Sequence, residues 1–217
     1  MMALIKLQNI EKQYEKKQPL FKDLSLEIES GEFVGLIGRS GSGKTTLLNI
    51  IGLITSVSKG KIEIDGYKNL SMDSKDALIL RRHTIGYLFQ NYGLIDDESV
   101  LWNLRLALEY KHISKKEKIT VIKEYLDKFG LGEMLNKKVY QLSGGEQQRV
   151  AIVKLMLQGS SIILADEPTS GLDNENERVV MNLLQDLNRA GATIIMVTHN
   201  MQLCDYFSRI IDVEKLR

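Results

Sequence analysis

The stretch "EFVGLIGRSGSGKTTLLNIIGLI", from Glu32 to Ile54, decides the fold. It opens with a near-continuous apolar run, which is typical of a strand buried on both faces of a sheet. The glycine-rich loop "GRSGSGKT" follows at once, and an apolar helix is expected over residues 44–54. Such a loop turns successive backbone N–H groups inward, and the helix amino terminus adds partial positive charge. The stretch therefore predicts a strand, a polyphosphate-binding loop and a helix.

The loop fits the pattern of a glycine, four residues and then Gly-Lys-Ser/Thr, which is found in nucleoside triphosphate sites. Lys44 would reach the β- and γ-phosphates, and the Thr45 hydroxyl would ligate Mg²⁺. We expect the nucleotide to contact the residues of the loop and the one that follows it, namely Gly38, Arg39, Ser40, Gly41, Ser42, Gly43, Lys44, Thr45 and Thr46.

Two adjacent carboxylates follow a second buried strand, "SIILADE" (residues 161–167). The strand ends place Asp166 and Glu167 at the carboxyl edge of a sheet, where α/β proteins bind ligands. Asp166 would hold Mg²⁺, through water. Glu167 is our general-base candidate, which would orient and polarise the attacking water.

The rest of the chain alternates buried strands (85–90 and 192–199) with helical patterns (173–189), which predicts an α/β fold with a mostly parallel sheet. Segments 4–8, 24–29 and 61–69 instead alternate apolar and polar residues, as half-buried strands do. The last of them turns at Asp65-Gly66, a strong hairpin signal. The expected core is therefore a P-loop nucleotide triphosphatase (RecA-like) sheet with an N-terminal antiparallel β region.

A helical lobe is predicted inside this core. Helical spacing replaces strand runs from residue 91 to residue 158. We therefore expect a nucleotide-binding α/β core made of residues 1–90 and 159–217, with residues 91–158 as an inserted helical subdomain of one overall domain.

Composition bounds the function. With a formal net charge of +1, the chain has no electrostatic footprint for nucleic acid. The "KKEK" run at residues 115–118 is interpreted as a solvated helix face. The only cysteine, Cys204, rules out an internal disulfide and is expected to be a small core residue on a helix face. With no apolar run near the roughly 20 residues that span a bilayer, and no secretory signal, we expect a soluble, intracellular chain.

A second glycine-rich turn, "QLSGGEQQRV" (residues 141–150), starts a helix without a lysine. Ser143 and Glu146 have capping-box spacing, which by itself predicts only an ordinary helix start. Gly144 and Gly145 each weaken a helix by roughly 0.5–1 kcal/mol relative to alanine, so a purely structural cap would not favour both. We interpret the turn as a phosphate contact supplied to a second copy, whose own loop provides the lysine. Two nucleotides would then be held between two chains.

The combination of "GRSGSGKT", Gln90, "LSGGEQQR", "ILADEP", "SGLD" and His199, in this order, resembles the ATP-binding cassette (ABC) ATPases over essentially the whole chain. The resemblance implies ATP and Mg²⁺ as ligands. It implies that Tyr14, 24 residues before the loop, stacks on adenine, although a tyrosine packed on the core is the alternative. Gln90 would sense Mg²⁺ and attacking water at the hinge into the lobe.

The resemblance also assigns the remaining site residues. Asp173 would reach across the dimer interface with Ser143, Gly144, Gly145 and Glu146, although it could equally be a simple helix N-cap. His199 would contact the γ-phosphate, so that the catalytic set becomes Lys44, Gln90, Glu167 and His199. His83 and His112 have no comparable setting and are expected at the surface.

The resemblance implies that two copies, identical or not, dock on a separate integral membrane permease at the cytoplasmic face of the membrane. The segment after Gln90, with Trp102, would receive a permease helix, although Trp102 could instead be buried in the lobe. Within the family, the chain is similar to the MacB, LolD and FtsE type, and "LFQN...LIDDESV" is most like ATPases of bacteriocin or antimicrobial-peptide export. Ser170-Gly171 departs from the Gly-Asn found in many of that group.

Other functions are left open. Some MacB-type systems transmit mechanical force without moving a solute. A soluble ABC protein in DNA repair or translation is disfavoured, because a long coiled-coil insertion, a second cassette and basic extensions are not seen. A nucleotide-binding regulator that does not hydrolyse is disfavoured by the presence of both Glu167 and His199.

Overall fold

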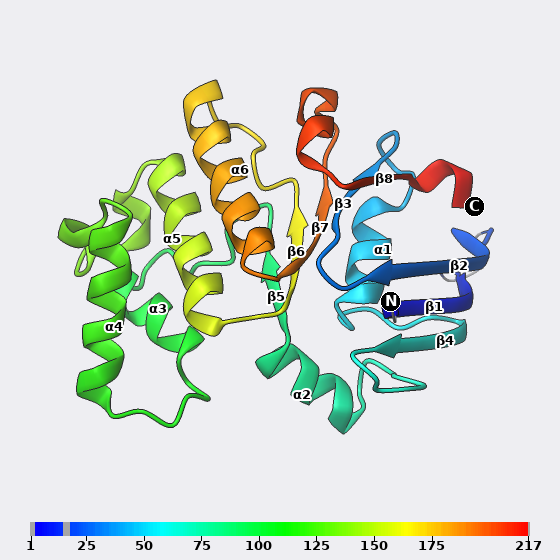
Figure 1. Cartoon of the computed structure of the whole chain (residues 1–217), viewed down its shortest axis with the longest axis horizontal. Helices are drawn as coiled ribbons and strands as arrows, with labels where there is room; N and C mark the ends of the chain where they lie inside the picture. Colours follow the sequence, from blue (N-terminus) through cyan, green and yellow to red (C-terminus); the bar gives the residue numbers. More distant parts are fainter. Residues whose placement is uncertain (1–2, 15–17, 217) are drawn as a thin grey trace.

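A five-stranded parallel sheet forms the centre of the molecule (Figure 1). The computed structural model describes residues 3–14 and 18–216. The strand order is β5-β6-β7-β3-β8, and every described pair in this sheet is parallel. The strands span Ile85–Leu88 (β5), Ile162–Asp166 (β6), Thr193–Val197 (β7), Phe33–Ile37 (β3) and Arg209–Asp212 (β8). The predicted parallel α/β core is confirmed, although β8 was not anticipated from the sequence.

A second, antiparallel sheet lies beside the first, as the alternating N-terminal segments predicted (Figure 1). Its central strand is β1 (Ala3–Lys12), flanked by β2 (Phe21–Glu29) and β4 (Lys59–Ile64). The turn after β4 falls at Asp65-Gly66, with φ angles of 51° and 79° as a two-residue hairpin turn requires. The returning segment pairs through an isolated Ile64–Tyr67 bridge and a hydrogen bond from the Leu70 N–H to the Ile62 carbonyl at 2.9 Å, but it forms no second strand.

Three helices accompany the sheets: α1 (Lys44–Ile51), α2 (Lys75–His83) and α6 (Asn174–Arg189). Helix α1 ends three residues before the predicted Ile54, because Gly52 caps it and the chain turns. Helix α2 was not predicted. It is short and buries only Ala77 and Leu80, while its apolar Leu78 and Ile79 are exposed.

The segment between β5 and β6 is helical and has its own apolar core. It contains α3 (Val100–Ala107), α4 (Lys115–Lys128) and α5 (Gly144–Gln158), which lie together on the side away from the antiparallel sheet (Figure 1). Buried residues of this segment, including Val100, Ile122 and Val150, form a cluster separate from the two clusters around the sheets. The division at residues 90/91 and 158/159 stays a prediction.

Short 3-10 helices complete the chain. They are η1 (Gly132–Met134), η2 (Val139–Gln141), η3 (Met201–Tyr206) and η4 (Val213–Leu216). The last two follow β7 and β8, so they lie at the carboxyl edge of the parallel sheet, where the polar residues gather.

Candidate functional site

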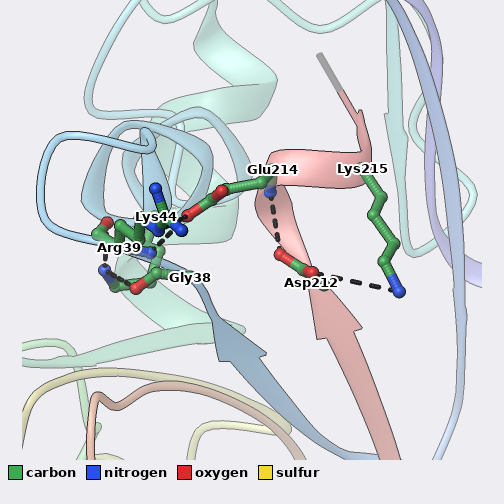
Figure 2. Close-up of polar contacts among 6 residues, drawn as sticks. All are labelled: Gly38, Arg39, Lys44, Asp212, Glu214 and Lys215. Carbon is green, nitrogen blue, oxygen red and sulfur yellow. Dashed lines mark hydrogen bonds and ion pairs between the residues drawn. The ribbon is translucent and has the colours of Figure 1, made fainter.

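The loop that follows β3 wraps around its own lysine. Gly38, Gly41 and Gly43 have φ angles of 142°, 76° and 101°, a region of backbone space that favours glycine. The Lys44 ammonium is buried and donates to the carbonyl oxygens of Gly38 at 2.7 Å and Arg39 at 3.0 Å (Figure 2). The glycines therefore permit a closed loop, and the loop holds Lys44 in place.

A carboxylate from η4, the 3-10 helix that follows β8, holds the first peptide of this loop (Figure 2). The Arg39 backbone N–H donates to Glu214 Oε1 at 2.7 Å, and the Glu214 backbone N–H donates to Asp212 Oδ1 at 3.0 Å. This contact was not predicted, because β8 is only four residues long and two of them are exposed.

Asp166, the last residue of β6, lies next to the start of α1. The Thr45 hydroxyl donates to Asp166 Oδ1 at 3.2 Å. Burial raises the pKa of the Asp166 carboxyl above its ordinary value, and the hydrogen bond from Thr45 opposes this rise. A hydroxyl and a carboxylate oxygen are ligands that suit Mg²⁺. No group of three or more His, Cys, Asp or Glu side chains suited to a metal occurs among the described residues, so phosphate and water oxygens would complete such a site.

Glu167 and His199 come from the carboxyl ends of neighbouring strands, β6 and β7. His199 Nδ1 lies 3.3 Å from Glu167 Oε2. Glu167 has a φ angle of 46°, unusual for a residue with a side chain, and its N–H donates to the Val197 carbonyl at 3.1 Å. A cavity of about 420 Å³ joins these two side chains to the loop, and it is lined by Leu20, Ser40, Gly41, Gly43, Lys44, Thr45, Thr46, Glu167 and His199.

Tyr14 lies at the surface near this cavity and does not pack into the core. The residue is 47% exposed, and its hydroxyl lies 3.4 Å from the Thr46 hydroxyl. The buried Lys12 ammonium lies 4.5 Å from the ring centroid. Gln90, by contrast, is exposed two residues after β5 and is not among the described residues that line the cavity.

The second glycine-rich turn starts α5 and stays apart from the cavity, to whose lining no described residue of the turn contributes. Ser143 and Glu146 form the predicted capping box, and hydrogen bonds from Ser143, its backbone N–H above all, lower the pKa of the Glu146 carboxyl. A Cβ on Gly144 would lie 3.3 Å from the Tyr92 hydroxyl, and one on Gly145 only 2.6 Å from the Asn176 Oδ1.

These distances give a second reason for glycine at position 145, because a side chain there would collide with Asn176. The predicted phosphate contact of Gly144 and Gly145 with a second copy stays a prediction.

Asp173 caps α6, whose Asn176 N–H donates to Asp173 Oδ1 at 2.8 Å. Hydrogen bonds from Asn176 lower the pKa of the Asp173 carboxyl. The simple N-cap role that the sequence left open is therefore present, and it leaves the exposed carboxylate at the surface.

Three other sequence expectations have different outcomes. Trp102 is 37% exposed and so is not buried in the lobe. Cys204 lies in the 3-10 helix η3 and is only half-buried, which corrects the expected core position. His83 and His112 are exposed, as predicted. No helix within the described part of the chain is long and apolar enough to cross a membrane.

The parallel sheet, the glycine loop around Lys44 and the acidic end of β6 define a P-loop nucleoside triphosphatase. Comparison with known proteins narrows this class. Residues 21–170 match the ABC transporter family. The chain belongs to the ABC transporter family and is an ATP-binding, ATP-hydrolysing member of it.

Several relatives are similar over nearly the whole chain. The macrolide export ATP-binding/permease protein MacB of Shewanella sp. (strain ANA-3) is 41% identical over 200 residues, which cover 92% of this chain and 30% of MacB. An uncharacterized ABC transporter ATP-binding protein of Methanocaldococcus jannaschii is 41% identical over 211 residues, covering 96% of this chain and 94% of that protein. The chain thus spans less than a third of the MacB protein that it matches.

A solved structure is also closely similar. The dimeric post-hydrolysis structure of the ATP-binding cassette MJ0796, bound to ADP and Pi, superposes with a TM-score of 0.87 at 37% identity. The match covers 97% of this chain and 95% of that one.

Proposed function

We propose that this chain closes as a dimer around two ATP molecules and thereby drives a separate membrane permease that exports a substrate. The observation that carries the proposal is the separation of the two glycine-rich turns. The cavity beside Lys44 is open, and Ser143 does not contribute to it. A second copy related by a two-fold axis can supply its Ser143–Glu146 turn and Asp173 there. The dimeric structure of MJ0796 supports this arrangement.

The proposed chemistry uses the residues around the cavity. Lys44 and the backbone N–H groups of the loop would bind the β- and γ-phosphates. Glu167 would accept a proton from the attacking water, and His199, 3.3 Å away, would orient the carboxylate and contact the γ-phosphate.

Thr45, Asp166 and Gln90 would hold Mg²⁺, which neutralises phosphate charge when bound. Because Gln90 lies exposed after β5, it would have to move inward when nucleotide binds. Tyr14 would stack on the adenine.

A permease helix is the proposed occupant of the surface around Gln90. Eight of the fourteen exposed large apolar side chains in the described residues lie between residues 78 and 113, on α2, on α3 and in the segments that follow β5 and α3. They are Leu78, Ile79, Phe89, Ile95, Trp102, Leu106, Tyr110 and Ile113. Exposed apolar and aromatic residues in such density mark interaction surfaces. The name of the MacB relatives combines an ATP-binding protein and a permease, and this favours a permease as the partner.

The proposed cargo is a bacteriocin, an antimicrobial peptide or a lipid-linked molecule. This proposal rests on the "LFQN...LIDDESV" resemblance and on the export function in the name of the MacB relatives. The chain itself would lie at the cytoplasmic face of the cell membrane, bound to the permease.

The dimer is tested with Glu167→Gln, which should bind ATP without turning it over. Saturating Mg-ATP is expected to convert this variant from a monomer into a stable dimer on a sizing column. The matched control, Lys44→Ala in the same background, should stay monomeric because it cannot hold the phosphates. A Glu167→Gln chain that remains monomeric with bound ATP would count against the dimer.

The permease is tested by co-purification from detergent-solubilised membranes. A MacB-type permease should be recovered with the chain and lost with the double variant Phe89→Glu/Trp102→Glu, which places charge in the apolar surface. Recovery of ribosomes or DNA in place of a permease would overturn the transport function.

A further inference from the structure

Asn176, in the first turn of α6, contacts both parts of the chain that the proposed dimer presents to its partner. Its side-chain Nδ2 donates to Asp173 Oδ2 at 2.9 Å, beside the bond from its backbone N–H to Asp173 Oδ1. On its other side, Arg149 Nη1 donates to Asn176 Oδ1 at 3.3 Å. One half-buried amide therefore joins α6 to α5, the helix that begins at the second glycine-rich turn.

The Gly145 backbone and the Asn176 amide meet closely. A Cβ at position 145 would lie 2.6 Å from Asn176 Oδ1 and 2.8 Å from its Cγ, distances that carbon atoms do not tolerate. The amide could move away only by giving up its bonds to Asp173 and Arg149. Glycine at position 145 thus allows the Asn176 amide to pack directly against the backbone of the Ser143–Gly145 turn.

The chemistry of the two neighbours matches the two ends of an amide. Asp173 needs a donor and Arg149 needs an acceptor, and asparagine supplies one of each. Arg149 Nε is itself buried without a partner among the described residues, so Asn176 Oδ1 is the contact that ties this guanidinium to α6. An aspartate at position 176 would keep the acceptor, lose the donor and add a charge beside Asp173.

We propose that Asn176 is a positioning residue that holds the Ser143–Gly145 turn and Asp173 as one rigid surface, so that both reach the partner's ATP together. The inference rests on the proposed dimer. It deepens that proposal by naming the side chain that sets the geometry between the two contacts, which lie in separate elements, 28 residues apart along the chain at their nearest (Gly145 and Asp173).

The fold does not depend on this side chain. Whatever side chain residue 176 carries, its backbone N–H can still donate to the capping carboxylate of Asp173, and α6 is anchored by buried Val180, Met181 and Leu184. Removal of the amide should therefore leave the monomer folded and its own phosphate loop intact.

The test uses Asn176→Ala and Asn176→Asp in the Glu167→Gln background, with exposed Asn174→Ala as the matched control. We expect the ATP concentration for half-maximal dimerisation to rise about tenfold in Asn176→Ala, the loss typical of one hydrogen bond to a charged group. Asn176→Asp should be affected more, and Asn174→Ala should match the parent. Monomer affinity for a fluorescent ATP analogue and the melting temperature should be unchanged in all three.

A second arm adds Gly145→Ala. If Gly145 and Asn176 act through one contact, the effects of Gly145→Ala and Asn176→Ala should not add. The double variant should then need no more ATP for half-maximal dimerisation than the single variant that dimerises less readily.

Distinct outcomes overturn the inference. The inference is overturned if Asn176→Ala dimerises like the parent, or if the losses of the two single variants add in the double variant. It is also overturned if a fall in melting temperature accounts for the lost dimer. A parent that fails to dimerise at all while binding ATP would overturn the dimer and the inference together. Dimerisation of the parent with no effect at position 176 would overturn the inference alone.

Discussion

The two glycine-rich turns look alike in sequence but need glycine for different physical reasons. In the loop after β3, Gly41 has a φ of 76° and open space where a Cβ would lie, so its backbone conformation requires glycine. In the first turn of α5, Gly145 is helical, and the space beside it is filled by Asn176. Gly41 thus uses the torsional freedom of glycine, whereas Gly145 uses its small volume. Glycines in two similar sequence motifs therefore need not tolerate the same substitutions.

The largest expected effect comes from breaking the first turn. Lys44→Ala removes the buried ammonium that the loop encloses, so ATP binding should be weakened and kcat should fall about 10²–10³-fold, as for other lost electrostatic contacts to a transition state. Steady-state hydrolysis and fluorescent-ATP titration measure the two losses. Lys59→Ala, an exposed lysine paired with Glu11, is the control and should behave like the parent.

Breaking the second turn should separate binding from hydrolysis. Ser143→Arg places a long cation at the start of α5, away from the chain's own cavity, so monomer ATP affinity should stay nearly intact. Hydrolysis should be abolished, because the turn could no longer approach a partner's phosphates. Titration of the monomer and an ATPase assay give the two readouts. A loss of monomer binding would mean that the turn serves its own loop.

The difference between torsion and volume can be sharpened at single glycines. Gly41→Val should destabilise the fold by about 1–2 kcal/mol, because a side chain other than asparagine or aspartate is strained in this backbone region. Gly41→Asn should cost clearly less. At Gly145, by contrast, the valine and asparagine variants should lose similar amounts of stability, since both side chains collide with Asn176. Urea unfolding of the four variants measures this, and an equal cost of both Gly41 variants would contradict the torsional explanation.

The smallest effect concerns pH. Because the pKa of Glu146 is lowered in the folded chain, its capping interaction is fully present above the ordinary value of 4.5 and is lost as the pH falls through the lower folded value. Glu146→Gln keeps the capping-box geometry without the charge. Thermal melting below pH 4.5 should therefore be less steeply pH-dependent in the variant, by no more than about 2 °C for so exposed a group. Equal slopes would exclude the carboxylate as a source of acid sensitivity.

The sequence predicted those elements that have strong local signals. The buried strands β3, β6 and β7 are almost entirely apolar. The motif at Gly38–Thr45 has a fixed residue spacing, and the structure has the predicted loop between β3 and α1 at this position. Helix α2 and strand β8 were missed because each buries one face or less, and their residues look like surface loops.

The site was predicted as far as its residues follow strand ends. Asp166, Glu167 and His199 could be placed together because parallel strands share a carboxyl edge. Contacts between distant elements could not, since Glu214 reaches Arg39 and Asn176 reaches Gly145 only after folding. Asn176 was not singled out in the sequence, because its contact with Gly145 joins two helices that are far apart along the chain.

The backbone of Glu167 has a consequence for the evolution of such a chain. A φ of 46° suits glycine or asparagine, so a glutamate there sacrifices about 1–2 kcal/mol of folding free energy. Selection for thermal robustness alone would favour Glu167→Gly, and laboratory screens for stability should return that inactive change. In the proposed mechanism Glu167 has to stay, because it accepts the proton of the attacking water, and robustness has to be found elsewhere in the molecule.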